Sequence, residues 1–171
     1  MPAPRPTSRR IGRPSIASAP LSLHQERLTH LVGYAASRAS IELKKAFARH
    51  LGPLDLKPVE FSILVLVAAN GEVNQRQLGR ALDVAPPNMA ITLDRMVERG
   101  WVERVRATRD RRAQLIHLTP AGRKLTQQAE KIAATMEDVA LSGMSAAERA
   151  LLIELLLKVA NTGSASVAEL Q

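Results

Sequence analysis

Apolar and polar positions along this chain recur mainly at helical spacing, and only one short region has the character of strands. In that region two segments with apolar residues are joined by a polar turn, which predicts a β-hairpin. The pattern therefore predicts a mainly α fold with a small β-hairpin. The expected helices cover about residues 22–50, 58–70, 75–82, 86–99, 120–139 and 145–160, and the expected strands cover residues 101–107 and 113–118.

The starts of several predicted helices have clear local signals. Ser22 and Ser145 each precede a Gln or Glu by three residues, which is the pattern of a capping box. Pro58 and Pro120 suit a first helical position, because proline lacks the N–H group that is unpaired there in any case. Thr119, directly before Pro120, is the expected N-cap of its helix.

Two of these helices are apolar nearly all round. We expect the helix over residues 58–70 to be buried for that reason. The helix over residues 145–160 carries more apolar residues than one small monomer can bury, so a second subunit is the economical partner. In the helix over residues 120–139, the apolar steps of four, three, four and three favour either a short coiled coil or packing on a neighbouring helix. This seam comprises Leu125, Ala129, Ile132, Met136 and Val139.

The helix over residues 86–99 has two distinct sides at 100° per residue. The predicted core side holds Met89, Leu93, Met96 and Val97, and the opposite side holds Asn88, Ile91 and Arg95. A hairpin with an arginine-rich turn follows this helix directly. Two helices followed by a basic hairpin predict a winged helix-turn-helix, which inserts one helix into the major groove of DNA with the loop beside it.

The charge of the chain also favours a nucleic-acid partner. The 171 residues carry a formal net charge of +8, and basic residues concentrate in residues 99–112. The first 20 residues contain four arginines, several prolines and no acid, which predicts a flexible arm held near DNA by its charge. Aromatic residues make up only 2% of the chain, which leaves few rings to stack on unpaired RNA bases.

Residue types used in catalysis and metal binding form no recognisable site. The absence of cysteine excludes disulfides and thiolate zinc sites. The four histidines lack metal-ligand spacing, and no glycine-rich phosphate loop or activated-serine motif occurs. We therefore expect no enzyme activity, no metal and no cofactor. No apolar run approaches the roughly 18 residues needed to span a bilayer, so we expect a cytoplasmic protein with no membrane association.

Five segments together resemble the multiple-antibiotic-resistance-regulator (MarR) family of bacterial transcription factors, over about residues 23–159. Each segment is a weak signal alone, but a Leu-Asp-Arg helix end, an Asp-x-Arg wing and a Leu-Thr-x-x-Gly segment after it form a specific combination. The segments are PVEF at 58–61, LGRAL at 78–82, LDRMVERGWVER at 93–104, DRR at 110–112 and LTPAG at 118–122.

The resemblance implies a homodimer whose first, fifth and sixth helices interlock while two winged domains bind a pseudo-palindromic operator on double-stranded DNA. We therefore expect a winged domain at residues 58–118 and a helical dimerisation region at residues 22–57 and 119–161. A disordered basic arm at residues 1–21 and a flexible tail at residues 162–171 would flank them.

Candidate DNA contacts on the helices are those of the outward side. The Asn88 amide can pair with adenine, and Ile91 can contact a thymine methyl group. Arg95 has two interpretations: it reaches guanine or a phosphate, or it forms a solvated or intramolecular ion pair. The expected helix contacts are Gln75, Arg76, Pro87, Asn88, Ile91 and Arg95.

The wing supplies the second group of candidate contacts. The resemblance implies that Asp110 shapes the wing tip and that Arg112 enters the minor groove, which attracts arginine where it is narrow. Arg109 and Arg111 are expected to contact phosphates, which adds affinity without sequence information. With only Asp110 to offset them, the arginines of this turn would repel one another unless an anion lies nearby.

The resemblance also implies a pocket for a small-molecule effector between the dimerisation helices and the winged domain. His30, Tyr34 and Arg38 recur at four-residue steps on the first predicted helix and could bind a carboxylate or phenol, with Phe61 as an apolar wall. The alternative is an ordinary solvent-facing polar stripe.

We therefore predict a dimeric repressor that a small aromatic or phenolic acid, or a derivative such as its CoA thioester, releases from its operator. One alternative is a helical interaction protein whose basic patch binds RNA or an acidic protein. Another is an architectural DNA-binding protein that responds to no ligand and prefers no operator over bulk DNA.

Overall fold

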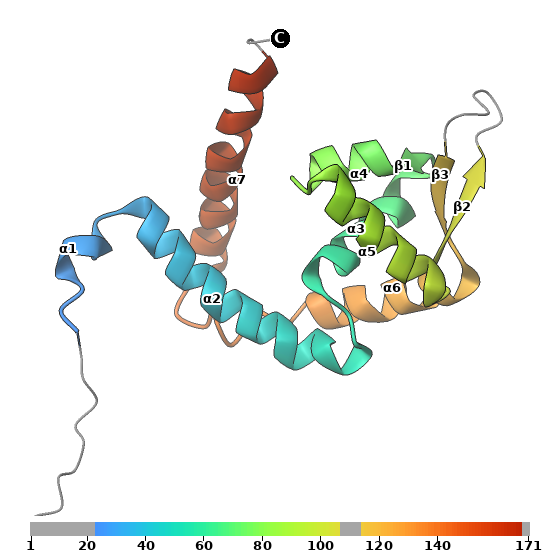
Figure 1. Cartoon of the computed structure of the whole chain (residues 1–171). Helices are drawn as coiled ribbons and strands as arrows, with labels where there is room; N and C mark the ends of the chain where they lie inside the picture. The colour runs from blue at the N-terminus through green and yellow to red at the C-terminus, as the bar shows by residue number, and fades with distance from the viewer. Residues whose placement is uncertain (1–22, 107–113, 169–171) are drawn as a thin grey trace, which may run out of the picture. The chain divides into compact units, whose positions relative to one another are not determined.

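The computed structural model describes residues 23–106 and 114–168, with side chains through residue 161 (Figure 1). It is mainly helical and contains one small sheet, as predicted. By their internal contacts the described residues fall into two compact units, which divide between Ala36 and Ser37. Within the described ranges, no helix is both long and apolar enough to cross a membrane.

The first predicted helix is interrupted. Instead of one helix over residues 22–50, α1 covers Glu26–Thr29 and α2 covers Val32–Leu51. At the break, the N–H of Leu31 donates to the carbonyl of Leu28 at 2.9 Å, a bond that spans three residues instead of four. A tight turn therefore replaces the α-helical ladder at this point.

The second unit contains the winged helix-turn-helix, with helices within a residue or two of the prediction. A short 3-10 helix, η1, follows α2 and leads into α3. The bounds are η1 Gly52–Leu54, α3 Pro58–Asn70, α4 Gln75–Ala81 and α5 Pro86–Glu98. α4 and α5 contact each other and both contact strands of the small sheet, which lies beside them in Figure 1.

The sheet has a third strand that the sequence analysis missed. β1 (Val73–Asn74) pairs antiparallel with β3 (Gln114–Leu118), and β3 pairs antiparallel with β2 (Val102–Arg106), so the strand order is β1-β3-β2. Val73 lies opposite Ile116, and both side chains are buried. A strand of two residues is too short to show alternation, so hydrophobic periodicity could not reveal it.

The hydrophobic core joins α3, α5 and the sheet, and α6 (Pro120–Ala133) packs on α3. The side chains of this core are aliphatic or methionine almost throughout, as the low aromatic content of the chain requires. The core confirms the inward side predicted for α5, except that Val97 is more than a third exposed. The largest fully buried apolar side chains of the described residues are Leu51, Ile63, Leu64, Leu78, Met89, Leu93, Met96, Val102 and Ile116.

The start of α6 is fixed against the start of β2. A Cβ atom at position 122 would lie 1.9 Å from the carbonyl oxygen of Trp101, so only Gly122 permits this close approach. Thr119 is the N-cap, as predicted: its hydroxyl accepts a hydrogen bond from the Gly122 N–H at 3.0 Å and donates to the Gly100 carbonyl at 2.6 Å. These contacts attach the base of the wing to the helix that follows it.

Capping boxes start two further helices. The predicted box at α7 is confirmed, because the Ser145 N–H donates to Glu148 Oε2 at 2.8 Å. A second box at α4 was not predicted: Asn74 and Gln77 each accept a hydrogen bond from the other's backbone N–H at 2.9 Å. The remaining predicted cap, Ser22, lies outside the described residues.

The two C-terminal helices differ in length from the prediction. α6 ends at Ala133, so Met136 and Val139 lie in turns instead of on a continuous apolar seam. α7 covers Ala146–Ala168 and thus continues past residue 160 into the segment expected to be a flexible tail. The α6 seam therefore ends before its last two predicted positions.

Candidate nucleic-acid interface

The N-terminal half of α5 presents exposed side chains next to a buried side. Met89 and Leu93 are completely buried, whereas Pro87 and Asn88 are exposed and the side chain of Ile91 is 66% exposed. Two prolines start the helix, so its first turn needs no N–H partners at those positions. The side predicted to face a DNA groove is therefore accessible over its first two turns.

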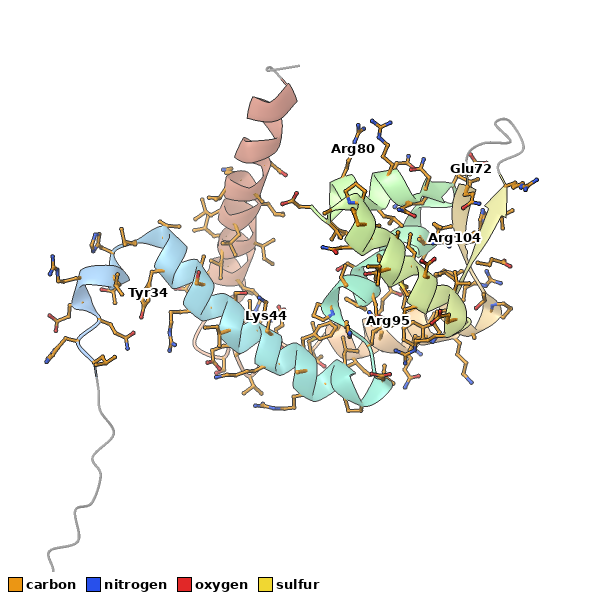
Figure 2. All side chains as sticks on the ribbon, in the orientation of Figure 1. Tyr34, Lys44, Glu72, Arg80, Arg95 and Arg104 are labelled. Atoms are coloured by element: carbon orange, nitrogen blue, oxygen red, sulfur yellow. The ribbon has the colours of Figure 1, made fainter. Side chains whose placement is uncertain are left out.

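α4 adds two exposed cations beside this part of α5. Arg76 and Arg80 are four residues apart on α4, and Figure 2 shows Arg80 on the outer side of the helix. Gln75 is half-buried and donates to the Pro86 carbonyl at 3.4 Å, which connects α4 to the start of α5. An open groove of about 830 Å³ lies here, lined by Gln75, Arg76, Gly79, Arg80, Asp83, Val84, Ala85 and Pro86. Its cations suit an anionic partner.

Arg95 forms the intramolecular ion pair that the sequence analysis had kept as an alternative. Its Nε donates to Glu60 Oε1 at 2.9 Å, and its Nη2 donates to the same oxygen. Glu60 is completely buried, and its other oxygen accepts the Lys57 backbone N–H at 2.7 Å. Both carboxylate oxygens are therefore occupied, and the Arg95 guanidinium is paired with Glu60 although 35% of its side chain stays exposed.

Two more ion pairs hold the C-terminal half of α5. Asp94 pairs with Arg104 of β2 at 2.6 Å, which ties the helix to the base of the wing. Arg99 donates to the Asp55 carbonyl at 2.8 Å, pairs with its carboxylate at 2.8 Å and lies 3.7 Å above the Trp101 ring. α5 therefore has an exposed N-terminal half and a C-terminal half bound to three neighbouring segments.

The predicted wing-tip contacts Arg109, Asp110, Arg111 and Arg112 lie outside the described residues. Arg106, the last described residue of β2, is exposed and extends the basic character of the strand toward the tip. The described part of β2 therefore ends in an exposed cation.

Three contributors were not assigned a role from the sequence. Arg80 could have been found from its four-residue spacing to Arg76 on one helix side. The Asp94–Arg104 pair joins residues on different elements, which no local pattern reveals. Glu60 has no predicted role beyond its place in the PVEF segment, because a buried glutamate is rare and its partner can be identified only from the fold.

Comparison with known proteins decides the family. Residues 54–113 match the model of the MarR family. The multiple antibiotic resistance protein MarR of Escherichia coli strain K12 is 28% identical over 132 residues, or 77% of this chain and 87% of that protein. The repressor CouR bound to a 23-mer DNA duplex is 33% identical with a TM-score of 0.76, covering 81% of this chain and 99% of that one. The chain belongs to the MarR family.

Membership fixes the broad role of this MarR-family chain. It is a transcription regulator with a winged-helix fold and not an enzyme. CouR has also been solved with p-coumaroyl-CoA; that chain is 31% identical, with a TM-score of 0.73 and coverage of 81% of this chain and 98% of that one. Within the described residues, no group of three or more His, Cys, Asp or Glu could hold a metal ion.

The predicted ligand residues fall in both compact units. In residues 1–36, His30 is exposed at the break after α1, and the Tyr34 hydroxyl donates to the Gln25 amide oxygen. In residues 37–171, Arg38 is exposed on α2, and half-buried Phe61 packs edge-on against Phe47 with ring centroids 6.0 Å apart. A ligand role for His30, Tyr34, Arg38 and Phe61 remains a prediction.

Arg38 also belongs to a solvent-facing charged stripe on α2. Lys45 lowers the pKa of Glu42 through a hydrogen bond and its charge, and the charges of Arg38 and Arg49 lower it further. This arrangement is compatible with a solvent-facing polar stripe, and it does not decide between that interpretation and a ligand role for Arg38. A second cavity of about 410 Å³ beside α6 includes His117, Arg123 and Glu130 among its lining residues, and none of the four candidates.

Proposed function

We propose that this MarR-family regulator is a homodimeric repressor that binds a pseudo-palindromic operator through the N-terminal half of α5. The observation that carries the proposal is the exposed start of α5, with Asn88 and Ile91 accessible and the α4 cations Arg76 and Arg80 beside it. Amide and apolar side chains read base edges, whereas exposed arginines neutralise phosphates. This combination suits sequence-specific binding in the major groove.

The wing supplies a second contact in this proposal. Arg112 enters the minor groove, Asp110 shapes the tip, and Arg109 and Arg111 contact phosphates. The support is the sequence of the turn, the family, and the basic strand end at Arg106. Because phosphate contacts release counterions, they make the affinity depend strongly on salt concentration.

A homodimer is supported by the surface of α7. Its large apolar side chains are exposed, although such residues are normally removed from water in a stable assembly. In the described chain nothing covers them, and a twofold partner with the same helix would do so. The side chains are Leu151, Ile153, Leu155, Leu156, Leu157 and Val159, each at least 43% exposed.

A small aromatic or phenolic acid, or its CoA thioester, is the proposed effector. The support is the CouR structure with p-coumaroyl-CoA, together with the candidate residues His30, Tyr34, Arg38 and Phe61. Release from DNA requires that the effector bind better to the conformation that does not fit the operator.

A competition experiment tests the repressor proposal. Protein is bound to labelled DNA from its own promoter region and competed with random duplex or with RNA, before and after addition of p-coumarate or p-coumaroyl-CoA. We expect the promoter to bind at least about a thousandfold more tightly than random duplex, and an effector to release it. Equal competition by random duplex would identify an architectural DNA-binding protein, and stronger competition by RNA would identify an RNA-binding protein.

A further inference from the structure

We propose that Glu60, a buried carboxylate on α3, determines operator selectivity by positioning α5 through Arg95. This inference rests on the proposed operator binding by α5 and assigns to that site a residue that cannot touch DNA. Glu60 has no exposed surface, and within the part of the chain that the structure describes its carboxylate bonds to Arg95 of α5 and to the Lys57 N–H. Arg95 lies on the same side of α5 as Asn88 at 100° per residue, and its side chain is 35% exposed while it reaches Glu60.

The bond from Arg95 to Glu60 holds the C-terminal half of α5. It can therefore control the orientation of the N-terminal half, which carries Asn88. Asn88 precedes Arg95 by seven residues, or about 10 Å along the helix at 1.5 Å per residue. A tilt of about 10° around Arg95 would therefore move Asn88 by roughly 2 Å, which is enough to break a hydrogen bond that needs about 3 Å. A small change in the position of Arg95 would therefore displace Asn88, which is proposed to contact a base.

The ion pair is expected to persist when DNA is bound. If Arg95 turned outward to a base or phosphate, it would leave a fully buried carboxylate without its cation, which is strongly unfavourable. A pair that stays closed is neutral overall and releases no counterion from DNA. Arg95 and Glu60 are therefore positioning residues, and they should affect base preference without changing the salt dependence.

A double-mutant cycle on operator affinity tests the proposal. Glu60→Gln, Arg95→Gln and the double variant are titrated with operator and scrambled duplex at several salt concentrations. We expect each single variant to lose about tenfold in operator affinity, and the double variant to lose no more than either single one, because the pair acts as a unit. Affinity for scrambled duplex and the salt slope should match the wild type.

The contrary result is clear. If Glu60→Gln keeps wild-type operator affinity while Arg95→Gln weakens both duplexes and flattens the salt slope by about one unit, Arg95 contacts phosphate directly and the proposal is wrong. Wild-type operator affinity in both single variants would also overturn it. A wild-type protein without any operator preference would instead refute the proposed function, and this shows before any substitution is made.

Two further variants separate positioning from loss of stability. Thr126→Val removes a buried hydrogen bond of 2.8 Å to the Gly122 carbonyl on α6, away from α5, and should lower thermal stability without lowering operator affinity. Glu60→Asp keeps the charge but withdraws it by one methylene, so it provides a second test if Glu60→Gln folds poorly. It should show the same loss of operator preference, and wild-type preference in it would contradict the proposal.

Discussion

Helices α3 and α7 are both apolar nearly all round, and in both the third residue is a glutamate that accepts a hydrogen bond from the backbone N–H of the residue before the helix. In α3 the Lys57 N–H donates to Glu60 at 2.7 Å, and in α7 the Ser145 N–H donates to Glu148 at 2.8 Å. The two glutamates differ in their exposure to solvent. Glu60 is completely buried beside Arg95, whereas Glu148 is exposed to solvent.

The apolar side chains of the two helices differ in the same way. Ile63 and Leu64 of α3 are completely buried, whereas Ile153 and Leu157 of α7 are more than half exposed. Burying one such side chain is worth about 1.5–3 kcal/mol. An apolar pattern thus predicts that a helix needs a covering surface, but not whether its own chain or another chain supplies it.

The largest effect is expected from substitutions that break the proposed contact between the α7 helices of two chains. Replacing Leu152 and Leu156 with Asp should give monomers or insoluble protein, because carboxylates would have to be buried in an apolar interface. Sedimentation velocity measures the outcome. The matched control replaces the exposed residues Ala68 and Ala69 of α3 with Asp, which should leave the dimer intact. A soluble, folded Leu152/Leu156 variant that still sediments as a dimer would place the interface elsewhere.

Truncation of one leucine on each helix sharpens the comparison. Leu64→Ala should lower the free energy of unfolding by about 2–5 kcal/mol, because it leaves a cavity in the core of one chain. Leu156→Ala should raise the dimer dissociation constant, since it weakens association, whereas Leu64→Ala should leave that constant near the wild-type value. Denaturant unfolding and sedimentation equilibrium measure the two quantities. An unchanged dissociation constant in Leu156→Ala would show that this side chain lies outside the interface.

A substitution at the reading end of α5 should have a smaller effect. Asn88→Ala is expected to reduce discrimination by about 1–3 kcal/mol per half-site, with little effect on stability because Asn88 is exposed. In a dimer the loss occurs at two half-sites, so a mixed dimer with one altered chain should lose about half as much. Titration of wild-type, mixed and fully substituted dimers measures this. Equal losses in the mixed and fully substituted dimers would contradict two independent reading helices.

The smallest effect concerns the cap of α7. The Ser145 backbone N–H, and then its hydroxyl, lower the pKa of Glu148 below its usual 4.5. A carboxyl with a lowered pKa stabilises the folded state above its unfolded pKa, and this contribution is lost as the pH falls through the folded value. Glu148→Gln should therefore flatten the decline of stability below about pH 4.5.

Thermal melts between pH 3 and pH 6 measure the contribution of this cap. Ser145→Ala should also flatten the decline of stability in this pH range, because it removes the hydroxyl that bonds to Glu148 while leaving the backbone N–H. An unchanged pH profile in Glu148→Gln would show that the cap does not contribute to the stability of α7.

Much of the fold could be predicted because the signals were local. Proline at the first positions of α3 and α6, the Thr119 cap and the two-sided pattern of α5 all act within a few residues. The break between α1 and α2 was not predicted, because the apolar pattern continues across it. There the Leu31 N–H bonds to the Leu28 carbonyl, three residues earlier, in place of the α-helical bond to a carbonyl four residues earlier. The short strand β1 was missed because its existence depends on pairing with β3.

The candidate site was less predictable than the fold. Asn88 and Ile91 are exposed as the helical pattern predicted, because exposure follows directly from helix geometry. The sequence left two interpretations of Arg95, and the partner that holds it lies 35 residues earlier on another helix. A charged residue on an outward side can thus be engaged by a buried partner, and only the tertiary structure shows which partner that is.

The stoichiometry of the protein on its operator tests the central claim most directly. Native mass spectrometry would be applied to the wild-type protein bound to a duplex containing the selected promoter site. Two chains per duplex, with two protected half-sites about one helical turn apart, is the result that a twofold dimer reading DNA with α5 predicts. One chain per duplex at undiminished affinity would contradict it.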